Sequence, residues 1–368
     1  MARYERPIVD AVQFAVDEIN QSGGLLGRPV EAVLADCRSE AAHCAREAER
    51  LISEVHVSVL FGCGEVSCRK AVTPIVERHR HLLFYPLHYE GMDQSPNVVY
   101  LGATPNQQLI PAIRWALDTL GRRFYLIGSD DMFSRTANLI IRDIIAAQGG
   151  EVLGERYLAA KAEARLHGIG AAIEELRSTR PDVVINSING DINHTFFGAL
   201  LGMGLNEKQL PVVSMDFDEN TLQTMPAGAM AGHYAVQSYF QALPGSINQR
   251  FVAAFRKHFG ADRVISDPME VAYVGVKLWA QAVQEAGTEQ PAQIGITSLR
   301  QSMAAPEGIV SVDKENHHLW RNAHVGRARA DGQFDVIWSS NAPIRPQPYP
   351  SYRTIADWRQ RLKKAGLR

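Results

Sequence analysis

Several polar side chains follow short apolar segments of the chain, where they could contact a small ligand. Ser67, His88 and Asp130 each follow a different segment, and Asn189 and Asp191 follow a fourth. Their hydroxyl, imidazole, carboxylate and amide groups can donate hydrogen bonds to a polar molecule or accept them from it. These residue types favour a small polar binding site, provided that the fold brings the four loops together.

Each of these residues also has a purely structural explanation. Ser67, Asp130 and Asp191 stand where a helix would begin and could serve only as N-caps. Tyr85, in the second apolar segment, could be an ordinary core aromatic, and His88 could be a hydrogen-bonded surface histidine. The combination of the four loops favours binding more than any single residue does.

Catalytic motifs are absent from the sequence. It contains no G-x-S-x-G, no G-x-x-x-x-G-K-[ST], no H-E-x-x-H, and no G-x-G-x-x-G after an apolar segment. The side chains of Asp130 and Asp131 would point in different directions at the start of a helix, so we do not expect them to act together as a catalytic carboxylate pair. His88 with Glu90 or Asp130 as an acid/base set is the one enzyme alternative that we retain. We predict a protein that is not an enzyme and that needs no metal or cofactor.

The four cysteines do not have the spacing of a metal site. Six residues separate Cys37 from Cys44 and four separate Cys63 from Cys68, whereas a zinc half-site has the pattern C-x2-C. We expect small, mostly apolar thiols without a chemical role. A bridge between Cys63 and Cys68 stays an open alternative.

Composition limits the partners of the protein. The 368 residues are 46% apolar and 21% charged, and 38 Lys+Arg against 40 Asp+Glu leave a net charge of −2. A basic surface for nucleic acid is therefore not expected. No apolar run reaches the roughly 18 residues of a membrane span, and residues 1–10 lack the apolar core of a signal peptide. The length predicts more than one domain, since one core seldom grows beyond about 250–300 residues.

Short apolar segments alternate with amphipathic ones along most of the chain. The apolar segments have the composition of strands buried on both faces: Val57–Gly62, Leu82–Pro86, Val98–Leu101, Phe124–Ser129, Val183–Ile188 and Leu210–Met215. Helices are expected between most of them, for example over 106–120 and 135–148. This alternation predicts a doubly wound α/β fold, in which ligands bind outside the carboxyl ends of the strands.

Two α/β blocks are expected, over residues 1–103 and 104–236. Residues 246–303 have helical patterns without strands of their own, so we expect them to pack back onto the first sheet. The chain then shows an antiparallel pattern around the turn pair Asp331-Gly332, with strands at Ile309–Val312, His324–Arg329 and Phe334–Trp338. A short basic helix is predicted near Ile355–Lys364.

The loops after the strands resemble those of a known family. The matching segments are Phe61-Gly62-Cys63, Arg69-Lys70-Ala71-Val72, Tyr85-Pro86, Tyr89-Glu90-Gly91, Pro105-Asn106-Gln107, Gly128-Ser129-Asp130, Asn186–Asp191, Ser266–Glu270 and Asp331-Gly332-Gln333-Phe334. They are similar to segments of type I periplasmic-binding-protein-like proteins of the branched-chain amino acid superfamily. Within it, the similar branch holds urea-binding proteins of ABC transporters and short-chain amide sensors such as the aliphatic amidase regulator. The resemblance covers essentially the whole chain.

This resemblance implies a two-lobed α/β fold, with a mainly parallel doubly wound sheet in each lobe and a ligand cleft between them. The chain would cross between the lobes near Thr104, Gln237 and Gly308. Lobe 1 would then comprise residues 1–103 and 237–308, and lobe 2 residues 104–236 and 309–368. Both lobes would supply ligand-binding residues: Gly64, Val66, Ser67, Tyr85, Leu87, His88, Asp130, Phe133, Asn189, Asp191 and Gln237.

The sequence departs from the family pattern at three places. Family members begin with a strand and a glycine-containing loop, whereas this chain opens at the helix that follows, so we expect about one strand to be missing. Gly64 and Val66 replace an aromatic and a hydroxyl residue. Leu87 and His88 replace polar or small residues.

These replacements argue against urea itself as the ligand. The missing aromatic side chain at Gly64 should open space, and the missing hydroxyl at Val66 removes a hydrogen bond worth about 1 kcal/mol. Carboxylates are concentrated in the same loops, at Glu65, Glu90, Asp130, Asp131 and Asp191. We expect a ligand larger than urea that carries an amide, amine or amidine group, with Tyr85 and Phe133 against its flat faces.

We predict that the protein captures this small nitrogen-containing ligand by hinge closure and delivers it to the permease of an ABC importer. The alternative is a cytosolic sensor that controls amide metabolism through a partner regulator, and a remote one is an amide-hydrolysing enzyme. The compartment would be the periplasm if a signal sequence precedes this chain, and the cytoplasm otherwise. Nucleic acid binding and direct membrane insertion are not expected, and a homodimer stays open.

Overall fold

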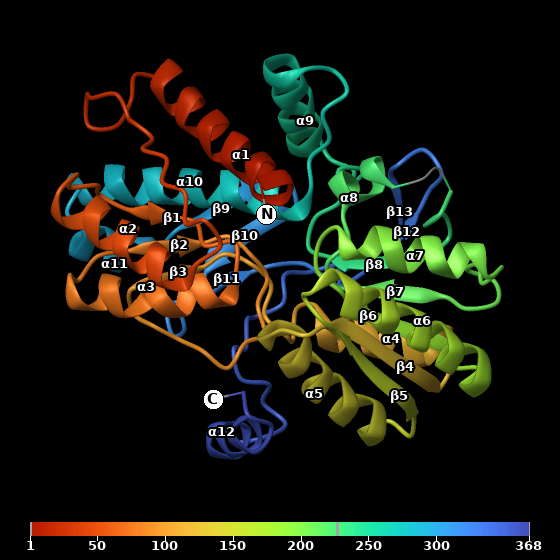
Figure 1. The fold of residues 1–368 in the computed structure, drawn as a ribbon. Helices are drawn as coiled ribbons and strands as arrows, with labels where there is room; N and C mark the ends of the chain where they lie inside the picture. Colours follow the sequence, from red (N-terminus) through yellow and green to blue (C-terminus); the bar gives the residue numbers. More distant parts are fainter. Residues whose placement is uncertain (1, 226–227, 368) are drawn as a thin grey trace.

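The computed structural model describes residues 2–225 and 228–367. Its elements form two groups that lie side by side in Figure 1. The first group, lobe 1, holds α1 (Ala2–Gln21), α2 (Ala41–Ser53), β1 (Leu60–Phe61), α3 (Val66–Arg78), β2 (Leu83–Tyr85), β3 (Val98–Tyr100), α9 (Ser246–Phe259), α10 (Asp267–Ala286), α11 (Pro291–Ser298), β9 (Ser302–Ala305), β10 (Gly308–Val312) and β11 (Leu319–Trp320). The second group, lobe 2, holds α4 (Leu109–Thr119), β4 (Arg123–Ser129), α5 (Met132–Ala147), β5 (Glu151–Leu158), α6 (Ala162–Thr179), β6 (Val183–Ser187), α7 (Ile192–Gly202), β7 (Val212–Ser214), α8 (Glu219–Thr224), β8 (Tyr234–Gln237), β12 (His324–Ala328), β13 (Phe334–Ser339) and α12 (Ile355–Lys364).

Lobe 1 is built around two short sheets. Strands β1, β2 and β3 are parallel, and β9, β10 and β11 form an antiparallel sheet. An isolated bridge between Tyr100 and His318 links the two. Phe84 and Val99 of the parallel sheet share a core cluster with Val274 of α10. The helical block after residue 245 therefore packs onto the first sheet, as its lack of strands predicted.

Lobe 2 contains one sheet of seven strands in the order β13-β12-β8-β7-β6-β4-β5. Strands β4 to β8 pair in parallel, and β12 and β13 add to the β8 edge in antiparallel fashion. Along β4, Phe124 and Leu126 pack in the core cluster of α4 and α5, while Tyr125 and Ile127 pack in that of α6 and α7. Successive strand side chains point to opposite faces, so a run of apolar residues buries this strand on both sides. The predicted doubly wound α/β fold is thus present.

All six strands predicted from apolar segments are present. Five are shorter than predicted and β4 begins one residue earlier, and α12 begins and ends where the sequence predicted. Strands β5, β8, β9 and β11 were not predicted. β5 lies at the edge of its sheet, and its residues are mostly half-buried. Edge strands alternate polar and apolar residues, so they lack the continuous apolar run that marks a central strand.

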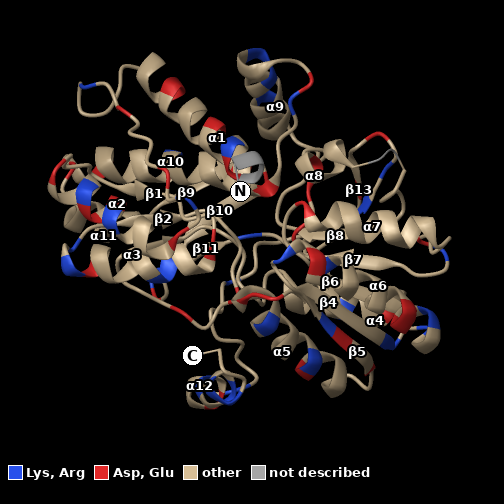
Figure 2. Ribbon diagram, in the orientation of Figure 1, with Lys and Arg blue, Asp and Glu red and all other residues tan. Residues whose placement is uncertain are grey.

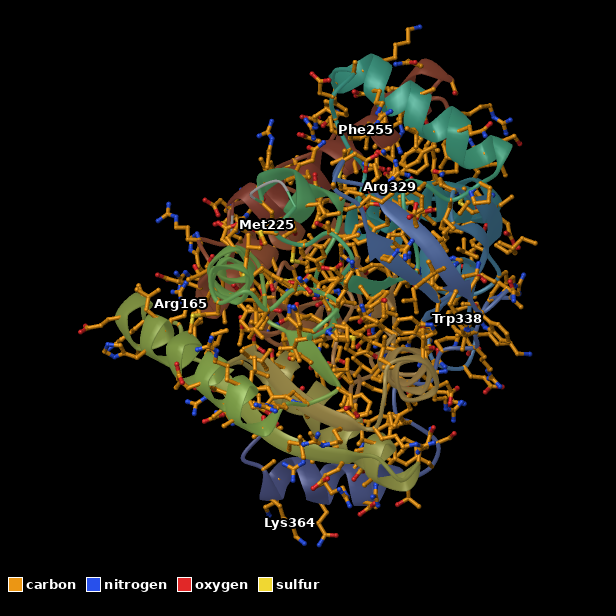
Figure 3. All side chains as sticks on the ribbon, turned by 90° about the vertical axis from the view of Figure 1, so that its right-hand side faces the viewer. Arg165, Met225, Phe255, Arg329, Trp338 and Lys364 are labelled. Carbon is orange, nitrogen blue, oxygen red and sulfur yellow. A yellow bond between two sulfur atoms is a disulfide. The ribbon has the colours of Figure 1, made fainter. Side chains whose placement is uncertain are left out.

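The end of the chain returns to lobe 2. Figure 3 shows Arg329 and Trp338 on the β12–β13 hairpin and Lys364 on α12, at the opposite end of the view from Phe255 on α9. Helix α12 is held against α5 by Asp143, which accepts hydrogen bonds from Arg353 at 2.7 Å and Arg361 at 3.2 Å.

We place the third crossing between the lobes after Trp320, not near Gly308 as the resemblance implied. Val310 and Leu319 are buried in the lobe 1 cluster that also holds residues of β2 and β3. The next strand, β12, begins at His324 and pairs with β8 of lobe 2. The boundary moves because the β9–β10 hairpin uses its apolar side chains to complete the core of lobe 1.

Charges of both signs are interspersed along the ribbon of both lobes (Figure 2). This agrees with the near balance of 38 basic and 40 acidic residues. Among the described helices, none is both long enough and apolar enough to cross a membrane.

Candidate ligand-binding site between the lobes

The beginnings of α3 in lobe 1 and α5 in lobe 2 meet at the junction of the lobes. The ring of His88 lies 4.9 Å from that of Phe133, centroid to centroid, in an edge-to-face arrangement. Val66, the first residue of α3, packs against the lobe 2 core cluster that contains Phe133. The Nζ of Lys70 is 2.6 Å from the Sδ of Met132. The structure therefore brings together Val66, His88 and Phe133 from the predicted set.

Asp131 is the carboxylate that the structure places at this junction. It caps α5 by accepting a 2.8 Å hydrogen bond from the backbone N–H of Ser134, and its Oδ2 accepts from the Nδ2 of Asn189 at 2.5 Å. Burial raises the pKa of Asp131 to about 6, and the carboxylates of Asp216 and Glu90 act in the same direction. The bonds from Ser134 oppose this rise without cancelling it. Asp131 is thus a partly desolvated acid in a negative field.

Two predicted carboxylates point elsewhere. The side chain of Asp130 is 45% exposed and accepts a 2.7 Å hydrogen bond from Arg135. That of Asp191 is 74% exposed and lies 3.9 Å from His194. We therefore replace Asp130 by its neighbour Asp131 in the candidate site and leave Asp191 out. The two carboxylates differ in placement because adjacent residues before a helix direct their side chains differently.

Tyr85 was expected to cover a flat face of the ligand, but it lies inside lobe 1. It is 1% exposed and packs edge-on against Tyr89 and Tyr100. The guanidinium of Arg69 lies 5.1 Å from its ring centroid and donates to Glu90 at 2.8 Å. Tyr85 therefore supports the loop that carries Glu90, and Phe133 and His88 are the rings at the junction.

Gly64 does not open space for a ligand, contrary to the expectation from its missing side chain. A Cβ placed there would lie 1.8 Å from the Oε1 of Glu5, so a side chain of α1 already occupies this position. Ser67 donates a hydrogen bond to Glu65, the N-cap residue of α3, whose own side chain does not cap the helix. The first N–H groups of α3 can therefore serve as donors to a carbonyl oxygen.

The remaining predicted residues have structural contacts. Leu87 is buried in the same core cluster as Tyr85. Gln237, at the end of β8, is 6% exposed and donates to the backbone carbonyl of Phe217 at 3.2 Å. It thus ties a crossing segment to the loop after β7. Asn189 remains in the site through its bond to Asp131.

Cys63 and Cys68 form a disulfide across the loop that begins α3. The bridge between Cys63 and Cys68, which the sequence left as an open alternative, is therefore present. Cys37 and Cys44 are free thiols, with Cys44 buried.

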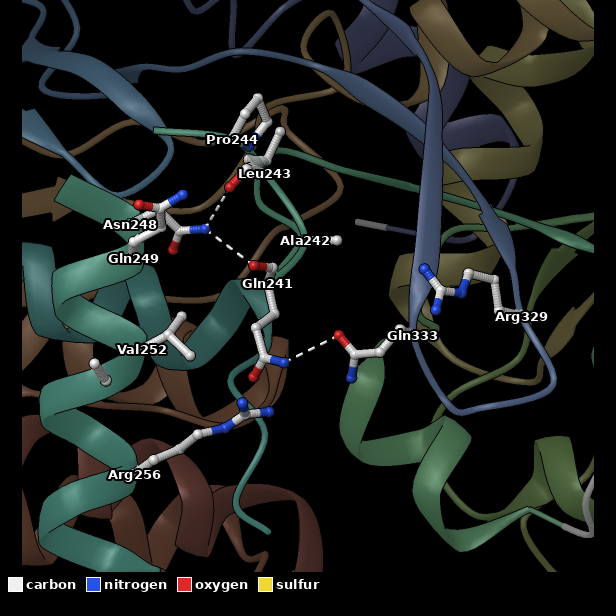
Figure 4. A pocket seen from close by; sticks show the side chains of 11 residues that line it. Gln241, Ala242, Leu243, Pro244, Asn248, Gln249, Val252, Arg256, Arg329 and Gln333 are labelled. Atoms are coloured by element: carbon white, nitrogen blue, oxygen red, sulfur yellow. Dashed lines mark hydrogen bonds between the residues drawn. The ribbon is translucent and has the colours of Figure 1, made fainter. Parts of the chain in front are cut away.

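An open pocket of about 520 Å³ lies at a different place, between the start of α9 and the β12–β13 turn (Figure 4). Gln241 donates to Gln333 at 3.0 Å there, and Asn248 donates to the backbone carbonyl of Leu243 at 2.8 Å. These bonds connect neighbouring segments, and none of the predicted site residues lines this pocket.

The chain belongs to the family described as periplasmic binding protein domain, whose model matches residues 1–355. The family assignment from the loop motifs is therefore confirmed at the level of type I periplasmic binding proteins. Membership makes this chain a solute-binding protein rather than an enzyme.

The structures with the same fold include ABC transporter solute-binding proteins. One from Rhodopseudomonas palustris HaA2, in complex with p-hydroxybenzoic acid, has a TM-score of 0.83 and 18% identity, covering 96% of each chain. One from Rhodopseudomonas palustris BisB5, in complex with 3,4-dihydroxybenzoic acid, has a TM-score of 0.82 and 20% identity, covering 93% of this chain and 94% of that one. The branched-chain amino acid transporter substrate-binding protein LivJ of Streptococcus pneumoniae, in complex with isoleucine, has a TM-score of 0.79 and 19% identity, covering 94% of this chain and 96% of that one. At these identities the likeness shows the fold.

A curated relative, limonene hydroxylase of Geobacillus stearothermophilus, is 36% identical over 127 residues. The match covers 34% of this chain and 23% of the relative. Because the shared part is less than a quarter of that protein, its name transfers no activity to this chain.

Proposed function

We propose that this chain is the solute-binding protein of an ABC importer, working in the periplasm, and that its ligand is a small nitrogen compound with a positive charge or several N–H donors. Family membership and the shared fold of ABC transporter solute-binding proteins support the general role. The observation that carries the ligand class is the partly buried carboxylate of Asp131 at the lobe junction, whose pKa is raised first by burial and then by the carboxylates of Asp216 and Glu90.

The residues at the junction suggest how such a ligand is held. An amine, amidine or amide N–H group would donate to Asp131, whose carboxylate is already oriented by Asn189. The rings of His88 and Phe133 would pack against the carbon skeleton or the flat amide face. A carbonyl oxygen on the same ligand would accept from the N–H groups at the start of α3, beside Val66.

The negative charge at the junction also predicts a ligand preference that differs from that of proteins with the same fold. Those from Rhodopseudomonas palustris hold hydroxybenzoic acids, which carry a carboxylate at neutral pH. A ligand carboxylate placed beside Asp131 and Asp216 would be repelled, whereas a cation would be attracted. Glu90 contributes less, because it is already paired with Arg69. We therefore expect nitrogen compounds to bind in preference to benzoates.

A ligand panel tests this assignment. Thermal shift followed by calorimetry would compare urea, acetamide, guanidine, small alkyl amines and amidines, branched-chain amino acids and p-hydroxybenzoate. We expect stabilisation by a nitrogen compound larger than urea and none by p-hydroxybenzoate. Stabilisation by urea alone or by benzoates alone would contradict the proposed ligand class.

Adjacent aspartates provide a matched pair of variants. Asp131→Asn retains a good N-cap for α5 but removes the charge, so the best ligand should bind about 10- to 150-fold more weakly, equivalent to roughly 1.5–3 kcal/mol. Asp130→Asn removes an equal charge one residue away, at an exposed position paired with Arg135. It should leave affinity within about twofold, since exposed ion pairs contribute little. Equal losses in both variants would refute the role of Asp131.

A further inference from the structure

All four cysteines of the chain converge at one place in lobe 1, although they come from separate segments. Cys37 lies in the loop before α2, and Cys44 lies in the first turn of that helix. Cys63 precedes α3, and Cys68 lies in its first turn. Because no other cysteine exists in the sequence, the fold has gathered every thiol of the protein into one cluster.

The sulfur atoms of this cluster have the separations of a metal site. The Sγ atoms of Cys37 and Cys68 are 3.9 Å apart, and those of Cys37, Cys44 and Cys68 all lie within 4.8 Å of one another. Cys63 is bonded to Cys68, so the fourth sulfur adjoins one member of this group. A tetrahedral zinc ion with Zn–S bonds of about 2.3 Å would hold its four sulfurs roughly 3.8 Å apart.

The surroundings of the cluster favour a cation. The carboxylates of Glu5 and Asp36 act electrostatically on Cys37, and those of Glu5 and Glu65 act on Cys44, so negative charge surrounds the cluster. Thiolates are disfavoured here unless a positive charge compensates them, and a bound divalent ion supplies that charge.

We propose that the four cysteines form a binding site for one Zn²⁺ ion when the Cys63–Cys68 disulfide is reduced. Four sulfur ligands in tetrahedral arrangement suit zinc, and separations of 3.9–4.8 Å suit a single ion rather than an iron–sulfur cluster, whose thiolates stand farther apart. Cys44 and Cys68 are buried while Cys37 and Cys63 are half-buried, so the ion would enter from the side of the latter two. This proposal does not rest on the identity of the ligand at the lobe junction.

The disulfide form and the four-thiol form of the cluster differ by a two-electron reduction. A phosphine supplies two electrons and is oxidised to its phosphine oxide with the oxygen of one water molecule. The Cys63–Cys68 bond breaks, and the two protons of that water complete two thiols. Zn²⁺ then binds without further electron transfer, and the thiol protons are released to solvent. An oxidising compartment such as the periplasm would retain the disulfide, so the four-thiol form belongs to the protein before oxidation or under reducing conditions.

The site also adjoins the candidate ligand site. Cys63 and Cys68 flank the segment that carries Gly64, Val66 and Ser67, and Val66 contacts the core of lobe 2. A metal bound to these cysteines would therefore set the position of the start of α3.

Cobalt substitution tests the proposal on the full chain. The protein would be reduced with a phosphine under anaerobic conditions and titrated with Co²⁺. A phosphine is chosen because it brings no thiol that could bind the metal. We expect thiolate-to-cobalt charge-transfer absorption and the visible bands of tetrahedral Co²⁺ to saturate at one equivalent and to be displaced by one equivalent of Zn²⁺. The unreduced protein should show neither, because two of its four sulfurs are held in the disulfide.

Variants assign the ligands. Cys37→Ser and Cys44→Ser should each lower the charge-transfer intensity by about a quarter, one thiolate in four. His43→Ala is the control, because His43 adjoins Cys44 but its side chain contacts Arg46 instead. Alkylation followed by mass spectrometry provides a second readout on the wild-type chain: one equivalent of Zn²⁺ should protect all four thiols. Absence of saturable Co²⁺ absorption in the reduced protein, unprotected thiols, or full intensity in both cysteine variants would overturn the proposal.

Discussion

At the scale of single residues, the site depends on which of two adjacent carboxylates faces the lobe junction. Asp130 is exposed and paired with Arg135, while Asp131 caps α5 and contacts Asn189. The pKa of Asp131 is raised to about 6, first by burial and then by Asp216 and Glu90. A cationic ligand would be bound by the ionised form, so proton and ligand should compete for the same carboxylate.

We therefore expect the affinity for a cationic ligand to fall by roughly tenfold between pH 7 and pH 5, as Asp131 becomes protonated. The stability of the ligand-free protein should respond in the opposite direction. The raised pKa means that the folded state holds the proton more tightly, so this group favours folding below about pH 4 and its contribution is lost as pH rises through 6. Calorimetric titrations over this range would show the step, and Asp131→Asn should abolish it. A pH-independent affinity in the wild type would rule the competition out.

At the scale of elements, α3 is anchored to lobe 1 by a buried arginine rather than by apolar side chains alone. Arg69 is fully buried, donates to Glu90 at 2.8 Å and to Asp93 at 3.3 Å, and lies 4.7 Å from the ring centroid of Tyr89. These contacts join the helix to the loop that follows β2. The helix begins at the lobe junction, so its anchoring also positions Val66 there.

Replacing Arg69 should lower the stability of the protein. Arg69→Met leaves Glu90 buried without its partner, and we expect a loss of about 3–5 kcal/mol in unfolding free energy. Arg78→Met in the same helix is the matched control: Arg78 is 59% exposed and pairs with a partly exposed Glu49, so its loss should cost under about 1 kcal/mol. Denaturant unfolding of the two ligand-free variants would measure the difference. Similar values would show that Arg69 is not the anchor.

At the scale of the whole molecule, two of the crossings between the lobes are tied together by ionised groups. Asp267, at the start of α10, accepts 2.8 Å hydrogen bonds from the backbone N–H groups of Ser238 and Tyr239 and pairs with Arg321 at 3.1 Å. Arg321 also pairs with Glu307 at 2.6 Å and lies 3.5 Å from Glu270. One buried guanidinium thus faces three carboxylates, and burial raises the pKa of Glu270 well above its usual value and that of Glu307 to about 7. Hinge closure would pivot about these segments.

This arrangement predicts opposite effects for two variants. Glu270→Gln should leave stability near pH 7 unchanged or raise it, because the raised pKa of Glu270 already favours its neutral form. Arg321→Met should cost about 3–5 kcal/mol. Its loss should be greater at pH 8 than at pH 5, since Glu307 is protonated below about 7 and then needs no cation. Denaturation of both variants at the two pH values would check the signs, and a stabilised Arg321→Met would contradict them.

Much of the fold could be predicted because the signals are local. A run of apolar residues such as Phe124–Ser129 is buried on both faces wherever its sheet lies, and the pattern over Ile355–Lys364 is amphipathic whatever it packs against. The edge strand β5 and the short β11 have no such run, so their pairing partners define them. The third crossing was misplaced for the same reason, because only the core of lobe 1 reveals that it takes in the β9–β10 hairpin.

By itself, the sequence determined the fold class and the family and suggested the candidate loops, since apolar periodicity and short motifs depend on residues close together in the chain. Only the tertiary structure decided which side chains those loops present. It turned Asp131 rather than Asp130 toward the junction, filled the space at Gly64 with Glu5 from α1, and gathered four cysteines whose spacing fits no metal motif. Each of these contacts joins residues that are neighbours in space through the packing of separate elements, and no local pattern encodes that packing.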